Sequence, residues 1–278
     1  MWKPRENTER LSKATLEPIA IIGIGCRFPG AQNPIEFWRL LRNGIDAVGQ
    51  LPKGRHCMGA FYDQDSTTPC EIPYWRGGFL DNFDQFDWRA FRISPREARY
   101  MDPQHRLLLE VTWEAFEDAG LPLEKLAGSR TGVFVGIMWN DYLRLQSRDL
   151  FQINGYSATG NVLAFAPNRI SYVFDLRGPS IAIDSACASS LVAVHAACQS
   201  LWAGESTLAI AGGVNLMLSP DATIMLAKAG LLSQEGLCKT LDARADGFVR
   251  GEGAGIIVLK PFSLLMESDD NLLFRRLA

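Results

Sequence analysis

The stretch from Gly178 to Gly204 constrains the fold more than any other part of the sequence. It reads GPSIAIDSACASSLVAVHAACQSLWAG, so a short apolar run is followed by small residues and then by apolar residues at helical spacing. We expect a buried strand over 181–183 and a helix that stops at Gly204, because glycine readily takes the left-handed conformation that ends helices. The chain must therefore turn tightly from a strand into a helix.

Cys187 lies at this expected turn. The first N–H groups of a helix lack intrahelical partners, and the helix N-terminus carries partial positive charge, so a thiolate is favoured there. A dipole effect of ~1–2 kcal/mol would lower the thiol pKa, ordinarily near ~8.5, by about one unit. Small neighbours leave room for a substrate, which suits a nucleophile. The alternative is a small buried hydrophobic side chain, the usual role of a lone cysteine.

Four other apolar runs are typical of strands, and helical segments separate them. Glycines interrupt two of these runs, at 212–213 and 251–253, which indicates a break in the first and a bulge or close backbone approach in the second. Residues 138–160 are polar and read as a loop, and 46–85 read as an irregular excursion. Strands alternating with helices predict a layered α/β fold. The runs cover 19–25, 131–137, 208–218 and 248–260.

Three helix starts are marked by a capping residue followed by proline: Asn33-Pro34, Ser94-Pro95 and Asp102-Pro103. Glu97 lies three residues after Ser94, as in a capping box. The first and third helices are expected to end at Gly44 and Gly120. Two further helices are expected over 161–174, where Pro167 predicts a kink, and over 222–229.

Composition and spacing exclude several classes of function. A net charge of −3 gives no general attraction to nucleic acid or anionic membranes, and no apolar run approaches the ~18 residues of a spanning helix. The six cysteines lack the spacing of a disulfide framework, which favours reduced thiols in the cytoplasm. Gly23-Ile24-Gly25 fails as a dinucleotide fingerprint because Phe28 replaces its third glycine, and His56, Cys57 and Cys70 are too few for a metal site.

The segment IAIDSACASSLVAVHAACQSL resembles the active-site segment of β-ketoacyl synthases, in the form found in modular type I polyketide synthases. Six further blocks resemble the same family in the same order, which makes the signal specific. They are PIAIIGIGCRFPG (18–30), FDWRAFRISPREARYMDPQHRLLLEVTWEAFEDAG (86–120), TGVFVGI (131–137), NRISYVFDLRGPS (168–180), AGGVNLMLSP (211–220) and CKTLDARADGFVRGEGAGIIVLKP (238–261).

The resemblance implies the N-terminal half of a thiolase-like fold, an α/β architecture with a five-stranded mixed sheet and helices on both faces. It implies a flexible lead-in over 1–17, a β-ketoacyl synthase N-terminal domain over 18–263, and a divergent tail over 264–278. In this family the strand that leads to the nucleophile lies at the dimer interface.

The implied function is an acyltransferase of polyketide or fatty-acid biosynthesis. Cys187 would hold an acyl chain as a thioester for decarboxylative condensation with a malonyl unit. The implied partner is an acyl carrier protein, whose phosphopantetheine arm carries the substrates. The resemblance implies no directly bound cofactor or metal, and no nucleic acid or membrane partner. It does imply a second protein chain, either another copy in a homodimer or a complementary half of the enzyme.

The sequence also departs from the family pattern. The family uses a cysteine and two histidines, the latter in His-Gly-Thr-Gly-Thr and Gly-His motifs, whereas the histidines here are His56, His105 and His195 in other contexts. His195 lies eight residues after Cys187, about 12 Å along a helix at ~1.5 Å per residue, too far to act as its base. We therefore expect a truncated synthase without independent turnover, and the alternative is an inactive remnant that serves dimerisation or interaction.

Basic residues cluster before and within the third helix. Arginine suits the recognition of carboxylates and phosphates, and acyl carrier proteins are acidic, so the cluster is a candidate docking surface, although charge runs are usually only solvated faces. Arg92 stands where the family commonly has glycine. The cluster comprises Arg89, Arg92, Arg96, Arg99 and Arg106.

Overall fold

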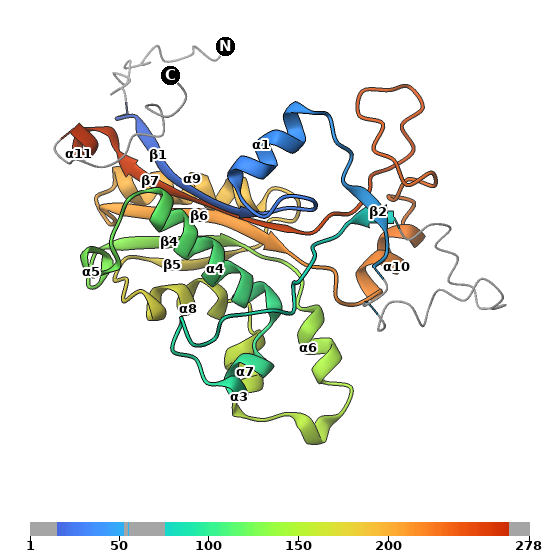
Figure 1. The fold of residues 1–278 in the computed structure, drawn as a ribbon, viewed down its shortest axis with the longest axis horizontal. Helices are drawn as coiled ribbons and strands as arrows, with labels where there is room; N and C mark the ends of the chain where they lie inside the picture. The colour runs from blue at the N-terminus through green and yellow to red at the C-terminus, as the bar shows by residue number, and fades with distance from the viewer. Residues whose placement is uncertain (1–15, 53–54, 56–75, 267–278) are drawn as a thin grey trace, which may run out of the picture.

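The computed structural model describes residues 16–52, 55 and 76–266. A five-stranded sheet with the order β1-β7-β6-β4-β5 runs through its centre (Figure 1). β4 is parallel to both β5 and β6, whereas β7 is antiparallel to β6 and β1, so the sheet is mixed as expected. The strands are β1 (Ile19–Arg27), β4 (Thr131–Gly136), β5 (Ser180–Ile183), β6 (Leu208–Asn215) and β7 (Gly253–Pro261).

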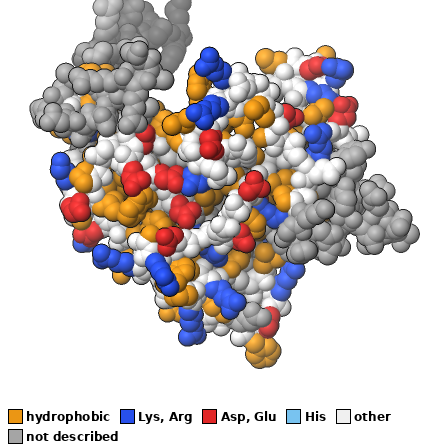
Figure 2. All heavy atoms as spheres, viewed as in Figure 1, with side chains coloured by type: hydrophobic (Ala, Val, Ile, Leu, Met, Phe, Trp, Pro, Cys, Tyr) orange, Lys and Arg blue, Asp and Glu red, His pale blue; other side chains and the backbone are white. Residues whose placement is uncertain are grey.

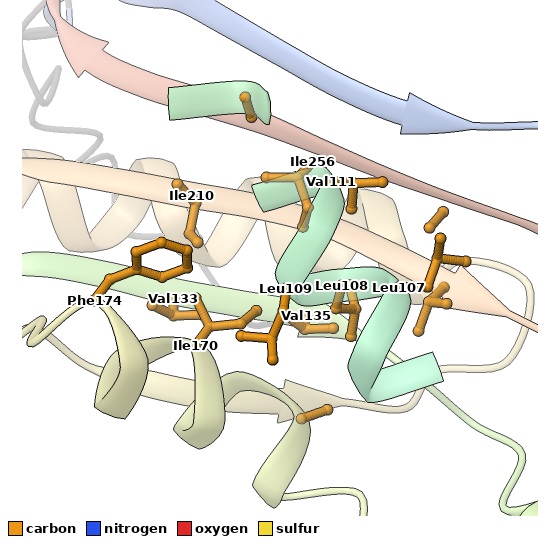
Figure 3. Close-up of a cluster of buried hydrophobic side chains, with 14 of the residues drawn as sticks. Leu107, Leu108, Leu109, Val111, Val133, Val135, Ile170, Phe174, Ile210 and Ile256 are labelled. Atoms are coloured by element: carbon orange, nitrogen blue, oxygen red, sulfur yellow. The ribbon is translucent and has the colours of Figure 1, made fainter. Parts of the chain in front are cut away.

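Side chains on opposite faces of β4 pack against different helices. Val133 and Val135 join the larger apolar cluster, which α4 (Pro103–Asp118) and α8 (Phe165–Val173) cover from one side (Figure 3). Phe134 points the other way, into a second cluster with residues of α9 (Ser189–Trp202). Alternation along a strand is what places successive side chains on opposite faces. The prediction of helices on both faces of the sheet is confirmed.

Glycines allow the layers of the fold to approach closely. A Cβ added at Gly25 of β1 would overlap the carbonyl oxygen of Val111 in α4, and one at Gly212 of β6 would overlap that of Gly255 in β7. The prediction that Gly212-Gly213 breaks the strand is therefore wrong, because β6 runs unbroken through both. The two glycines let neighbouring backbone pack against the strand.

The capping residues begin the helices as expected. The Asn33 side chain accepts from Glu36 N at the start of α1 (Pro34–Arg42), and the Ser94 side chain accepts from Glu97 N at the start of α3 (Pro95–Tyr100). The capping box is only half formed, because the Glu97 carboxylate pairs with Arg169 of α8 at 2.6 Å. This long-range ion pair ties α3 to α8.

The prediction of a loop over 138–160 is wrong. This segment contains α6 (Asp141–Gln146), the 3-10 turn η1 (Leu150–Gln152) and α7 (Gly155–Asn161). Each element is too short to show an apolar period in the sequence. Asn154, within the expected loop, caps α7 by accepting from Tyr156 N.

The expected kink at Pro167 is also absent from the described chain. α8 begins at Phe165, so the proline falls in the first helical turn, where backbone N–H groups have no intrahelical acceptor to lose. The remaining described elements are β2 (Val48–Gln50), β3 (Arg76–Gly78), α5 (Leu123–Leu126), α10 (Asp221–Lys228) and α11 (Phe262–Met266).

Several sequence predictions fall wholly or partly outside the described residues. These include the lead-in, the metal-site candidates His56, Cys57 and Cys70, and most of the divergent tail. The domain limits at 18 and 263 stay predictions. Among the described helices, none has the length and apolar character that crossing a bilayer requires.

Candidate active site

Cys187 lies on a tight turn between the end of β5 and the start of α9, and its side chain is exposed. Ala186 immediately before it has a φ of +54°, a left-handed conformation that L-residues rarely adopt. Three side-chain bonds hold the turn: Asp184 Oδ1 accepts from Ala186 N at 3.0 Å, and Ser189 Oγ accepts from Ser185 N at 2.9 Å while donating to Ala186 O at 2.6 Å. The turn thus presents the thiol in a fixed, outward position.

Two glycines at strand ends support the first turn of α9. A Cβ at Gly136, the last residue of β4, would lie 2.8 Å from Ser190 N, and one at Gly213 of β6 would lie 3.1 Å from Ser190 Cβ. No described side chain caps α9, whose N-cap is Ala188. The N–H groups of Ala188 and Ser189 donate to the carbonyl oxygens of Ser185 and Ala186, at 3.3 and 3.1 Å. Cys187 therefore lies at the N-terminal end of α9, as predicted, beside the positive end of the helix dipole.

Cys187 forms part of the wall of a cavity of about 860 Å³. This volume is within the range of small-molecule sites, roughly 300–1,000 Å³. Asn215, Arg250 and Glu252 add polar groups to a mainly apolar lining. The apolar lining includes Phe28 from the chain after β1, Phe37, Trp38 and Leu41 from α1, Ile137, Met138 and Trp139 from the chain after β4, and Leu226 and Phe248. An apolar group bound at the thiol would contact this lining.

Neither described histidine joins the thiol in this cavity. His105 is 1% exposed, and neither of its ring nitrogens has a hydrogen-bond partner among the described residues. Burial, together with the positive charges of Arg169 and Arg106, lowers the pKa of His105 to about 3. It is therefore a neutral core residue. His195 is exposed on α9 and is not among the residues that line the cavity.

The other described cysteines differ from Cys187 in their surroundings. Cys26 is buried, and burial raises the pKa of its thiol to about 11. Cys198 is half-buried on α9, and burial raises the pKa of its thiol as well. Cys238 is exposed on the chain before β7. No group of three or more potential metal ligands occurs in the part of the chain that the structure describes.

Sequence reasoning missed a set of buried polar side chains beside the cavity. Glu252 pairs with Arg55 at 2.6 Å, and its carboxylate also accepts from Leu80 N and Met217 N. Asp141 accepts from Leu218 N and Ser219 N. Burial raises the pKa of both carboxyls, Glu252 and Asp141. The one feature of the sequence that could have indicated these buried polar residues is Glu252, which lies between two glycines where an otherwise apolar strand begins.

The arginine cluster divides in two. Arg89, Arg92, Arg96 and Arg99 are exposed, whereas Arg106 is buried and donates to the carbonyl oxygen of Met101. Arg92 has a φ of +55°, which explains why glycine would suit this position. Figure 2 shows basic side chains gathered at the lower end of this face, where Figure 1 places α3, α6 and α7.

Comparison with known proteins identifies a family. The model described as "Beta-ketoacyl synthase, N-terminal domain" matches residues 16–264. One component of the phenolphthiocerol/phthiocerol polyketide synthase of Mycobacterium tuberculosis is 51% identical over 260 residues, which are 91% of this chain and 12% of that protein. Another component of the same synthase, from the same species, is 47% identical over 267 residues, 95% of this chain and 17% of that protein.

Two solved structures are similar in fold. The ketosynthase from module 6 of the bacillaene synthase of Bacillus subtilis 168 has a TM-score of 0.81 at 40% identity, covering 91% of this chain and 42% of its own. The oxazolomycin ketosynthase domain from Streptomyces albus JA3453 has a TM-score of 0.85 at 40% identity, covering 92% of this chain and 45% of its own. The chain thus spans under half the length of these ketosynthases and about an eighth of the first curated relative.

Proposed function

Because the chain belongs to the β-ketoacyl synthase family, with the thiolase-like fold of its N-terminal half, we propose that it carries the nucleophile of a condensing acyltransferase. Cys187 holds an acyl chain as a thioester, and a malonyl unit condenses with it after losing carbon dioxide. The observation that carries the proposal is an exposed thiol on a strained turn, at a helix N-terminus and in an apolar cavity. Similarity to polyketide synthases favours this function over an inactive remnant.

The loading step follows from the geometry of the site. The Cys187 thiolate attacks the carbonyl carbon of an acyl thioester, a new C–S bond forms, and the carrier's thiolate leaves and takes up a proton. The apolar lining beside the thiol suits the hydrocarbon part of the acyl group and excludes water that would hydrolyse the thioester.

We expect Cys187 to be the most reactive described thiol toward iodoacetamide near neutral pH. Cys187 is exposed at the start of α9, whereas Cys26 and Cys198 are less accessible and burial raises the pKa of their thiols. Time-resolved alkylation mapped by mass spectrometry measures the rate at each cysteine. Cys238 is the matched control, because it is exposed but lies on no helix N-terminus. Alkylation of Cys238 as fast as that of Cys187 would contradict the prediction.

The substrates are proposed to arrive on the phosphopantetheine arm of an acyl carrier protein. The docking surface that we propose for it comprises the exposed arginines Arg89, Arg92, Arg96 and Arg99. Leu150 and Phe151 of η1, 74% and 100% exposed, add an apolar tip on the nearby α6–α7 connection. Complementary charge of this kind accelerates association and selects the partner.

Reversing the charge at Arg92 and Arg96 to glutamate is expected to weaken carrier binding about 3- to 10-fold at low salt. The loss should shrink at high salt, because exposed charges beyond a Debye length of ~8–10 Å are screened. Fluorescence anisotropy with a labelled acyl carrier protein at two ionic strengths measures both effects. Reversing Arg39 and Arg42 to glutamate, an equal charge change on α1, is the control. If the double variant and the unmodified chain bind the carrier with equal affinity at low salt, these arginines are not its docking surface.

Self-association or a complementary half of the enzyme is also proposed as a partner. β5 is an edge strand, and its outward Ile181 is 44% exposed. α9 likewise carries exposed apolar residues, Leu191 at 74% and Val192 at 38%. Unpaired strand edges and exposed apolar residues are features that proteins usually cover. Both features flank the Cys187 turn, so a partner here would lie beside the site.

A further inference from the structure

Buried side chains accept hydrogen bonds from the chain that follows β6. In the 216–219 segment, four successive N–H groups donate to three buried residues, which are 4% exposed or less. Leu216 N donates to Gln104 Oε1 at 3.3 Å and Met217 N to Glu252 Oε1 at 2.9 Å. Leu218 N and Ser219 N share Asp141 Oδ2, at 3.1 and 3.0 Å.

Two of these acceptors connect the segment to the end of β4. Asp141 is the first residue of α6, which follows β4 after four residues. Gln104 of α4 also donates through Nε2 to the carbonyl oxygen of Trp139 at 2.8 Å. The chain after β4 and the chain after β6 are therefore joined through Gln104 and Asp141, at the edge of the sheet where both parallel strands end.

The same two strand ends carry the candidate nucleophile. The first turn of α9 rests on Gly136 at the end of β4 and on Gly213 near the end of β6. Gly213 lies three residues before the 216–219 segment, and Gly136 lies five residues before Asp141. A shift of one strand end relative to the other would move the support of this turn, and the Cys187 thiol with it.

We propose that Asp141 and Gln104 are positioning residues for Cys187. By holding the 216–219 segment against the chain after β4, they reinforce the β4–β6 pairing of Gly136 with Gly213, the two strand ends on which the first turn of α9 rests. They also fix Trp139, which lines the cavity that Cys187 shares. The proposal rests on the function proposed above, because it concerns the same thiol, but it assigns a role to residues that do not touch the substrate.

The test compares Asp141→Ala with Asp141→Asn. Alanine leaves two buried N–H groups without an acceptor, so the 216–219 segment must rearrange. Asparagine keeps an acceptor oxygen, and its NH₂ group replaces Oδ1, which has no described hydrogen-bond partner. We expect Asp141→Ala to slow alkylation of Cys187 by iodoacetamide about tenfold, and Asp141→Asn to stay within about threefold of the unmodified chain.

Thr131→Val is the matched control for loss of a buried polar contact. Thr131 is fully buried, and its hydroxyl contacts Ser129 Oγ at 2.7 Å at the opposite end of β4. Urea unfolding of each variant reports stability separately from thiol reactivity. If Asp141→Ala lowers the unfolding midpoint as Thr131→Val does but alkylates at the unmodified rate, the role of Asp141 is only structural and the proposal is overturned.

A second variant keeps the test decisive if Asp141→Ala fails to fold. Gln104→Met preserves the size of the side chain and removes both its hydrogen-bond donor and its acceptor. We expect this variant to slow alkylation of Cys187 at least about threefold. An unchanged rate overturns the proposal. Acyl transfer to Cys187 from an acyl N-acetylcysteamine thioester is measured in parallel. If the unmodified chain is alkylated at Cys187 but never acylated, the proposed function fails, while the alkylation rates still decide whether the residues position the thiol.

Discussion

Replacing Cys187 with serine is expected to lower the rate of acyl loading at least about 10³-fold. A serine hydroxyl is a poor nucleophile unless an adjacent base activates it, and none of the described residues that line the cavity is a histidine. Incubation with an acyl N-acetylcysteamine thioester, followed by intact-protein mass spectrometry, measures the acylated fraction over time.

Cys238→Ser provides the control for this experiment. Cys238 is exposed but lies outside the cavity, so its replacement should leave the rate of loading unchanged within about twofold. Peptide mapping of the loaded protein then locates the acyl group. Loading of Cys187→Ser at the unmodified rate, or an acyl group mapped to another residue, would remove Cys187 from the proposed chemistry.

Gly212→Ala is expected to cost more than about 4 kcal/mol of unfolding free energy, an unusually large effect for one methyl group. The added Cβ would overlap the carbonyl oxygen of Gly255 on the neighbouring strand β7. Backbone in the centre of a sheet has little freedom to move, so β6 and β7 would have to separate. Typical domains have only ~5–15 kcal/mol in total, so the variant should be largely unfolded or insoluble.

Gly155→Ala is a matched glycine-to-alanine control. Gly155 begins α7, has no atom within 4 Å of an added Cβ, and is not among the residues with a positive φ. Alanine there should leave stability unchanged or raise it by a few tenths of a kcal/mol, because alanine favours helices. Urea denaturation followed by circular dichroism compares both variants. An unchanged midpoint for Gly212→Ala would show that β6 and β7 do not pack as described.

Local signals in the sequence were sufficient for the parts of the fold that local chemistry decides. The residues Asn33, Ser94 and Asp102 cap helices as expected, since capping depends on a side chain and the N–H groups two or three residues later. The strand-to-helix turn at Cys187 was equally readable, because an apolar run, small residues and a helical period follow one another within a short stretch. The five-stranded mixed sheet, by contrast, was predicted from the resemblance to β-ketoacyl synthases.

Contacts between distant residues could not be read in this way. The spacing of Glu97 predicts a complete capping box, yet its carboxylate pairs with Arg169, 72 residues later. Arg106 belongs by sequence to an exposed basic cluster but is buried by the packing of α4. Asp141 lies in a polar stretch that indicates a loop, and its role as an acceptor depends on N–H groups 77 and 78 residues away. Each of these outcomes is decided by which elements pack together.

The pairing of β1 with β7 bears on how the chain folds during synthesis. Ile19 pairs with Pro261, so β1 leaves the ribosome long before its hydrogen-bonding neighbour, which lies near the end of the described chain. At ~5–20 residues per second, the wait is roughly 12–50 s. Through that interval β1 can dock on α4 through Gly23 and Gly25 but has no strand beside it. An unpaired apolar strand is a template for aggregation, so the nascent chain depends on chaperones or on early docking of α4.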